Sequence, residues 1–195
     1  MNTNHELCGS PEWRAHVQDE VLPTVLAEVD LGEDLIEVGP GYGATTDWLR
    51  DRVTRLTAVE IDGDLAGPLE QRYVDTNVRI VRADATAMTF ADDTFTAGVS
   101  FFMLHHVATP DAQDRLFAEL ARVLKPGSPF VAVDSVHSDD LEAWHEDDTF
   151  NPIDPEGLAQ RLEEAGFVEP AVQVREDDGG WFATARTPTT EHEHT

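Results

Sequence analysis

The sequence predicts an α/β fold in which helices cover both faces of a doubly wound, seven-stranded sheet that ends in a C-terminal antiparallel edge hairpin. Three observations support this prediction. From residue 34 onward, runs rich in β-branched residues alternate with helical patterns, which favours parallel strands. The first run, "DLIEV", leads into a glycine-rich turn. The last two runs are separated by "DDGG", which is typical of a hairpin.

The residues before the first strand are expected to form a helix. Ser10 can cap it, Pro11 suits its first position, and Pro23 predicts a bend. The expected parts of the chain are an N-terminal segment and helix covering the site (1–33), one domain (34–186) and a disordered tail (187–195).

The rest of the chain alternates between the two element types. Strands are expected at 34–38, 56–60, 78–82, 97–102 and 129–134, then at 168–176 and 179–186. Helices are expected at 44–52, 63–73, 111–124 and 155–165. Thr109 and Asp154 can cap the last two helices, each of which opens with a proline. The stretch between 134 and 155 is expected to be a polar segment, and ligands should bind at the carboxyl ends of the parallel strands.

The composition indicates one globular domain that can bury its own core, since 41% of its 195 residues are hydrophobic. The N-terminus lacks a basic and apolar signal, and the longest apolar run, "AGVSFFML", is too short to span a bilayer. A single cysteine, Cys8, excludes an intramolecular disulfide and a multi-cysteine zinc site. We expect a soluble, cytoplasmic protein.

The charge balance is strongly acidic. The 39 Asp and Glu residues against 13 Lys and Arg residues give a formal net charge of -26, and Lys125 is the one lysine. A field of this sign repels phosphate backbones and anionic lipids, which argues against nucleic acid and membrane partners. An acidic, lysine-poor surface resembles the surfaces of proteins from salt-loving organisms, so we expect halophilic character.

The turn after the first strand, in "EVGPGYGATTDWL", has the spacing of nucleotide-binding loops. A triphosphate is excluded, because such loops need a lysine before Ser or Thr and "GATT" has none. A dinucleotide stays open at this point. Gly39, Gly41 and Ala44 match the dinucleotide pattern, and Glu60 follows at a suitable distance to bind a ribose.

Charge at the turn favours a cationic ligand. Glu37 ends the first strand, and Asp47 lies in the first turn of the following helix, where a pyrophosphate would normally bind. S-adenosyl-L-methionine carries a sulfonium and an ammonium and no phosphate, so it fits these two carboxylates better than NAD does. A dehydrogenase also generally needs a further substrate domain, for which this chain is short.

Several segments together resemble class I S-adenosylmethionine-dependent methyltransferases. "EVGPGYG", "AVEID", "VRADATAMTFADDTF", "SFFMLHHV" and "LARVLKPGSPFVAVD" come in the order and spacing of that family. The resemblance is to the small-molecule branch, type 11, and covers about residues 34 to 186. It implies a Rossmann-like fold, S-adenosyl-L-methionine as cofactor and methyl transfer to a small-molecule acceptor.

The resemblance also implies roles for individual residues. Glu37 would lie near the cofactor ammonium, and Glu60 would hold the ribose hydroxyls. Ile61 would pack on adenine, while Asp84 and Ala85 would meet the adenine edge. The residues implied around the methionine part are those of the turn, Gly39, Pro40, Gly41 and Gly43, together with Phe101 and Phe102.

The acceptor is less constrained by the sequence. Methyl transfer from a sulfonium needs mainly alignment, and it needs a base only if the acceptor loses a proton. His106, just after the fourth strand, is the candidate base, and Trp13, Tyr42 and His145 are candidate acceptor contacts. The acidic loop after His145 is typical of a solvated segment, so no metal site is predicted.

Two other functions stay open. The rRNA adenine dimethyltransferases share the glycine motif and a "VEID" strand. They carry N-[LIV]-P-[FY] after the fourth strand to hold a flipped adenine, whereas this chain reads "SFFMLHH" there. A noncatalytic S-adenosylmethionine-binding protein would carry the same cofactor motifs without passing a methyl group on.

Overall fold

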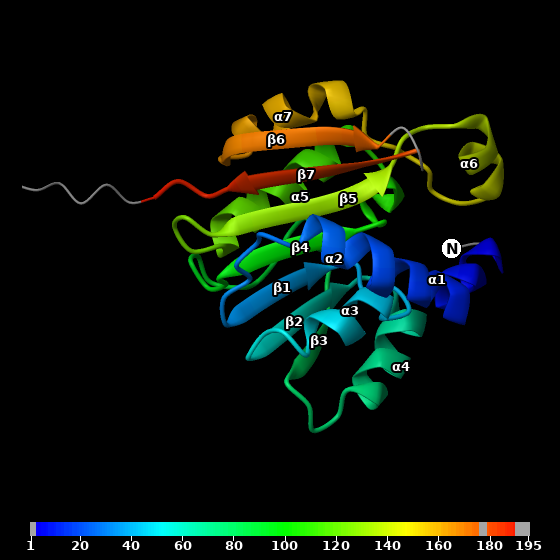
Figure 1. Cartoon of the computed structure of the whole chain (residues 1–195), viewed down its shortest axis with the longest axis horizontal. Helices are drawn as coiled ribbons and strands as arrows, with labels where there is room; N and C mark the ends of the chain where they lie inside the picture. The colour runs from blue at the N-terminus through cyan, green and yellow to red at the C-terminus, as the bar shows by residue number, and fades with distance from the viewer. Residues whose placement is uncertain (1–2, 176–178, 190–195) are drawn as a thin grey trace, which may run out of the picture.

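A seven-stranded mixed sheet forms the centre of the computed structural model, which describes residues 3–175 and 179–189 (Figure 1). The strands are β1 Asp34–Val38, β2 Arg55–Glu60, β3 Val78–Arg82, β4 Ala97–Phe101, β5 Pro129–Ser135, β6 Val168–Arg175 and β7 Gly180–Arg186. Their order across the sheet is β3-β2-β1-β4-β5-β7-β6. β1 to β5 run parallel, and β7 pairs antiparallel with both β5 and β6. The predicted α/β fold with an antiparallel edge hairpin is therefore confirmed.

The helices fall between the strands in the predicted order. They are α1 Pro11–His16, α2 Leu22–Val25, α3 Ala44–Leu49, α4 Gly63–Arg72, α5 Pro110–Val123, α6 Asp139–Trp144 and α7 Pro155–Glu164. Two short 3-10 segments, Thr3–Gly9 and Leu104–His106, and one π-helical stretch, Val17–Val21, complete the helical structure of the described residues.

Different helices bury the two faces of the sheet. One hydrophobic cluster joins α5 and α7 to the sheet and includes Phe117, Leu158 and Trp181. The other joins the N-terminal helices, α3 and α4 to the opposite face and includes Leu22 and Leu69. A strand covered on both faces is apolar along its whole length. β4 fits this rule, because each of its residues is buried.

The end signals of the helices work as the sequence predicts. The Ser10 hydroxyl accepts a hydrogen bond from the Trp13 backbone N–H at 3.1 Å, and Pro11 is the first residue of α1. Thr109 and Asp154 cap α5 and α7 in the same way. A π-helical stretch, Val17–Val21, separates α1 from α2, and Pro23 lies in the first turn of α2, so the bend at Pro23 stays a prediction. α3 ends at Leu49, earlier than the predicted 52.

One helix was missed by the sequence analysis. α6 lies inside the predicted polar segment and begins where the Ser138 hydroxyl accepts a hydrogen bond from the Leu141 N–H at 3.2 Å. None of its residues is buried, so it lacks the apolar period that marks a packed helix. α6 and α1 both lie at the end of the sheet toward which β1 and β5 point (Figure 1).

The C-terminal end differs from the prediction in one respect. Thr187, the first residue of the predicted disordered tail, is buried, and its hydroxyl donates to the Lys125 carbonyl at 2.6 Å. The boundary predicted at residue 187 is therefore too early. Residues 190–195 of that tail, and Asp177 and Asp178 of the predicted "DDGG" turn, lie outside the described residues. Among the helices that the structure describes, none has the length and apolar character required to cross a bilayer.

Candidate active site

A cavity of about 510 Å³ opens at the carboxyl ends of the parallel strands. It contains most of the residues that the sequence analysis selected, which are Trp13, Gly39, Pro40, Gly41, Tyr42, Glu60, Ile61, Asp84, Ala85, Phe101, Phe102 and His106. Three selected residues, Glu37, Gly43 and His145, are not among those lining it. We call the wall formed by residues that follow β1, β2 and β3 the cofactor side, because the predicted cofactor contacts Gly41, Glu60 and Asp84 lie there. The wall that contains His106 and other residues that follow β4 and β5 is called the histidine side.

The glycine turn gives the cofactor side its shape. Gly39 adopts a φ of +74° and donates its N–H to the Val59 carbonyl at 2.9 Å, which ties the turn to β2. A Cβ on Gly39 would lie 2.1 Å from Met103 Cγ, so no side chain fits. A Cβ on Gly41 would meet nothing within 4 Å. Backbone at Gly41 is therefore open to a ligand that needs close approach.

Glu60, the last residue of β2, holds the turn from the other side. One carboxylate oxygen accepts the Gly41 N–H at 3.2 Å, and the other accepts the Asp62 N–H at 2.9 Å. Burial raises the pKa of Glu60. Asp62 caps α4, since its side chain accepts a hydrogen bond from the Asp64 N–H at 2.8 Å. A carboxylate fixed in this way at the cavity wall is placed to accept hydrogen bonds from ligand hydroxyls.

Glu37 lies beneath the turn and reaches the cavity only through its neighbours. It is buried, and its two oxygens accept hydrogen bonds from the hydroxyls of Thr45 and Thr46. Thr45 itself lines the cavity. Burial raises the pKa of Glu37 to about 7, while the two threonine hydrogen bonds lower it. Glu37 is thus a buried support for the start of α3.

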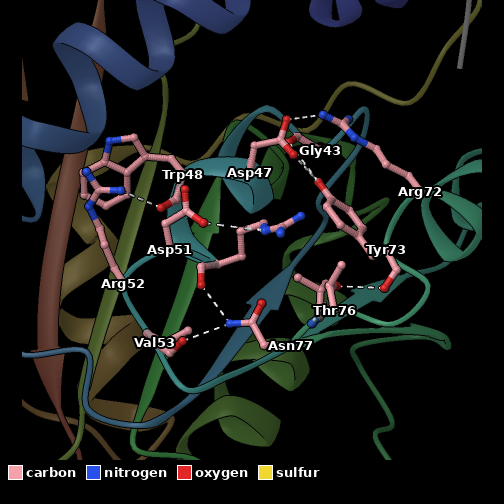
Figure 2. Close-up of polar contacts among 12 residues, drawn as sticks. Gly43, Asp47, Trp48, Asp51, Arg52, Val53, Arg72, Tyr73, Thr76 and Asn77 are labelled. Atoms are coloured by element: carbon pink, nitrogen blue, oxygen red, sulfur yellow. Dashed lines mark hydrogen bonds and ion pairs between the residues drawn. The ribbon is translucent and has the colours of Figure 1, made fainter.

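Asp47 is engaged by protein cations, which corrects the argument that it faces a cationic ligand. Figure 2 shows its carboxylate between Arg72 and the Tyr73 hydroxyl, which donates to it at 2.8 Å. Arg14 of α1 forms a further ion pair with the same carboxylate. Asp47 is not among the residues lining the cavity. Its charge is used to join α1, α3 and α4.

The end of β4 carries an unusual backbone at the histidine side. Phe102 adopts a φ of 54°, a left-handed conformation that is rare for a bulky residue. Its N–H donates to the Val133 carbonyl at 2.8 Å, and its ring meets the Trp13 ring edge to face at a centroid distance of 5.0 Å. This turn directs the chain from β4 toward His105 and His106.

Three histidine rings gather beyond this turn. The ring centroids of His105 and His106 are 4.2 Å apart, and those of His106 and His145 are 5.2 Å apart. His106 is half-buried and lines the cavity, whereas His105 and His145 are buried behind it. Burial lowers the pKa of His145. Because residues 106 and 145 are far apart in the chain, this cluster could not be recognised from sequence patterns.

The charged residues that line the cavity come from separate parts of the chain, so the sequence does not show that they lie together. Among the described residues that line it, four carboxylates accompany one guanidinium, that of Arg115 on α5. The carboxylates are those of Glu60, Asp62, Asp84 and Asp148. Such a wall favours a cationic ligand and disfavours a polyanion.

The fold and the cavity define a Rossmann-like domain with a nucleotide-binding turn. Comparison with known families places it further. Residues 36–132, about half of the chain, match the family described as "Methyltransferase domain". The chain belongs to the class I S-adenosylmethionine-dependent methyltransferases, in the type 11 branch, and its cofactor is S-adenosyl-L-methionine.

Curated relatives match only part of their own length. The chain is 39% identical over 75 residues to the ribosomal RNA small subunit methyltransferase A of Bordetella pertussis. This alignment covers 37% of this chain and 28% of that enzyme. It is 25% identical over 142 residues to the sterol 4-C-methyltransferase strm-1 of Caenorhabditis elegans, which covers 68% of this chain and 42% of that enzyme. The chain therefore spans less than half the length of these relatives.

Solved structures share the fold at low sequence identity. The PH0226 protein of Pyrococcus horikoshii OT3 is 17% identical with a TM-score of 0.76, covering 96% of this chain and 99% of that one. A chain from the complex of the Haloferax volcanii Trm112 methyltransferase activator with a methyltransferase is 16% identical with a TM-score of 0.72, with the same coverage. The Haemonchus contortus phosphoethanolamine N-methyltransferase 2, solved with phosphomonomethylethanolamine and S-adenosylhomocysteine, is 13% identical with a TM-score of 0.74, covering 96% of this chain and 58% of that one.

Proposed function

We propose that this chain transfers the methyl group of S-adenosyl-L-methionine to a small-molecule acceptor bound at the histidine side of the cavity. The observation that carries this proposal is one cavity of about 510 Å³ that extends from the glycine turn to His106. Cavities of about 300–1,000 Å³ are typical of small-molecule sites. The cofactor and the acceptor can therefore bind next to each other in this cavity.

Cofactor roles follow from the positions of the residues on the cofactor side. The Gly41 backbone approaches the methionine part, Glu60 accepts the ribose hydroxyls, and Ile61 covers one face of the adenine. Asp84 and Ala85 meet the adenine edge. Ile61 supports this assignment because it is exposed at 66% and lines the cavity, so its apolar side chain has a surface to offer.

The remaining cofactor positions belong to the methionine part. Gly39, Pro40 and Gly43 shape the turn, while Phe101 and Phe102 close it from β4. Glu37 acts as a positioning residue in this account, because Thr45 stands between its carboxylate and the cavity.

The acceptor binds beside Trp13, Tyr42 and His106, which line the cavity. His145 contributes through its contact with the other two histidine rings. His106 is the candidate base predicted from the sequence, and its imidazole could instead bind a metal ion. Either use places His106 at the acceptor and leaves the cofactor contacts to other residues.

An RNA acceptor is the alternative with an observation in its favour, the partial match to ribosomal RNA methyltransferases. The net charge of -26 and the four carboxylates of the cavity wall oppose it, since both repel phosphates. We therefore favour a small molecule.

Methyl-labelled S-adenosyl-L-methionine separates these functions. The purified chain is incubated with the labelled cofactor and either a metabolite extract or purified ribosomal RNA. We expect the label to enter the small-molecule fraction. Label in the RNA would establish the alternative, and cofactor binding without any transfer would establish a noncatalytic protein.

The acidic, lysine-poor composition is proposed to be an adaptation to high salt. Because the chain has 39 acidic and 13 basic residues, salt weakens the repulsion between carboxylates more than it weakens the attraction in ion pairs. The melting temperature should rise on the order of 5 °C or more between dilute buffer and molar KCl. A scanning measurement in which KCl steadily lowers the melting temperature would refute this adaptation.

A further inference from the structure

The histidine cluster brings together two segments that are distant in sequence. His105 and His106 come from the 3-10 segment after β4, and His145 directly follows α6. One ring nitrogen from each of the three histidines lies within 4.8 Å of the others. Three imidazoles at this spacing point to a ligand that they share.

Hydrogen bonds to two of the rings determine where their protons lie. His105 Nδ1 is 2.5 Å from a carboxylate oxygen of Asp134, and His145 Nδ1 is 2.7 Å from the Leu141 carbonyl oxygen. A carbonyl and an ionised carboxylate can only accept hydrogen bonds, so Nδ1 carries the proton in each of the two rings, and in the neutral form of the ring Nε2 carries the lone pair that a metal needs. Metal-binding histidines typically show this pattern, in which the second nitrogen donates to a carboxylate or a carbonyl.

The geometry is close to that of a metal site with an open position. Zinc binds imidazole nitrogens at about 2.0–2.1 Å, which places neighbouring tetrahedral ligands about 3.3 Å apart. The three nitrogens lie within 4.8 Å of one another, so side-chain rotations that bring them together by up to about 1.5 Å reach that arrangement. His105 is fixed from behind by Asp134, and Phe150 stacks on His145 at a centroid distance of 4.6 Å. The side that stays open is that of His106, which lines the cavity.

We propose that His105, His106 and His145 bind one divalent transition-metal ion, with zinc as the best match to three imidazoles, and that its fourth position faces the cavity. Three histidines and an open position are the ligand set of catalytic zinc rather than structural zinc. No metal site is predicted from the sequence, and the three proposed ligands carry no spacing motif, because about forty residues separate His106 from His145.

The open position gives the metal a role at the acceptor, and this part rests on the proposed function. An acceptor oxygen bound to the ion loses its proton to water more readily. The methyl then moves in line. The carbon–sulfur bond breaks with its electron pair going to sulfur, and the new bond forms from the acceptor lone pair. The structure thereby favours an acceptor with a hydroxyl or a similar metal-binding group near the methylated atom.

Metal titration tests the site without any methyl transfer. Co²⁺ or Zn²⁺ is added to the chelator-treated full chain, and binding is followed by calorimetry and by the visible bands of Co²⁺. We expect one saturable site per chain with the spectrum of a four- or five-coordinate ion. His106→Ala and His145→Ala should abolish it. Asp134→Asn should weaken binding about 10- to 100-fold, because His105 loses its charged support.

Matched variants test three of the other histidines. His16, the last residue of α1, pairs with Glu20 and does not line the cavity, and His192 and His194 belong to the C-terminal residues. His16→Ala and the double variant His192→Ala/His194→Ala should keep the full site. Circular dichroism verifies folding, and His106→Ala is the decisive variant because its side chain is only half-buried.

Three results would overturn the proposal: binding that survives His106→Ala in a folded chain, binding lost with His192 and His194, or no saturable binding at all. Failure of methyl transfer would leave this titration unaffected, so the two proposals fail separately.

Discussion

The two sides of the cavity are built in different ways. The cofactor side comes mainly from one stretch, residues 37 to 62, and is held by backbone contacts such as the bond from Gly39 to Val59 at 2.9 Å. The histidine side joins distant segments through side chains. Asn151 donates to the Val107 carbonyl at 2.9 Å across 44 positions, and His105 meets Asp134 across 29. Local backbone shape therefore forms one side, and tertiary packing forms the other.

This difference explains how much the sequence could predict. The fold could be predicted because strand and helix periods, helix caps and the glycine turn are local sequence signals. Ser10, Thr109 and Asp154 cap their helices as expected. α6 could not be predicted, because none of its residues is buried and its sequence therefore shows no apolar period.

The site divides along the same line. Glu60 and Gly41 could be selected from a motif whose spacing the fold preserves. The cluster of His105, His106 and His145 could not, since nothing in the sequence brings α6 to the end of β4. Asp47 shows a third case. The sequence suggests that its carboxylate contacts a ligand, whereas in the structure the carboxylate forms ion pairs with Arg14 and Arg72 and accepts a hydrogen bond from Tyr73.

The largest expected effect is a glycine substitution on the cofactor side. Gly39→Ala forces an alanine to a φ of +74° and places its Cβ 2.1 Å from Met103 Cγ. The free energy of unfolding should fall by about 3 kcal/mol or more. Chemical denaturation measures the loss.

Gly41→Ala is the matched control for packing. The backbone strain is similar, at a φ of +53°, but the new Cβ meets nothing within 4 Å. It should cost only about 1–2 kcal/mol of stability while weakening the binding of S-adenosylhomocysteine. Equal stability losses in the two variants would show that Met103 does not pack against the turn.

A smaller effect concerns pH and the buried carboxyl of Glu37. Its folded pKa, about 7, is raised by burial above the unfolded value of 4.5. The folded state thus holds a proton that the unfolded state has lost, so this contribution to stability is full below about pH 4.5 and disappears as the pH rises through 7. Glu37→Gln should remove up to about 3 kcal/mol of this pH dependence.

Denaturation of the wild type and the variant across pH 4 to 8 checks this expectation. Glu70→Gln, an exposed residue of α4, serves as the control and should leave the curve unchanged. Parallel curves for the wild type and Glu37→Gln would mean that the pKa of Glu37 is the same in the folded and the unfolded protein.

The smallest effect is expected at Asp47 (Figure 2). Asp47→Asn removes the charge that Arg14 and Arg72 share but keeps an oxygen for the Tyr73 hydroxyl. Because these pairs are partly exposed, stability should fall by only about 1 kcal/mol. Asp51→Asn, which loses a 3.7 Å pair with Arg50, should change less. Calorimetry should show unchanged cofactor affinity for both, and a weakened affinity in Asp47→Asn alone would restore a ligand role for Asp47.

One measurement tests most directly whether one side of the cavity binds the cofactor and the other side acts on the acceptor. The affinity for S-adenosylhomocysteine and the rate of methyl transfer to the acceptor found in the extract are measured for Glu60→Ala and His106→Ala. Glu60→Ala should weaken cofactor affinity roughly tenfold or more, because it loses charge-assisted hydrogen bonds. His106→Ala should bind the cofactor like the wild type and lose on the order of a hundredfold in turnover. A His106→Ala variant with full turnover, or with cofactor affinity as weak as that of Glu60→Ala, would contradict the account.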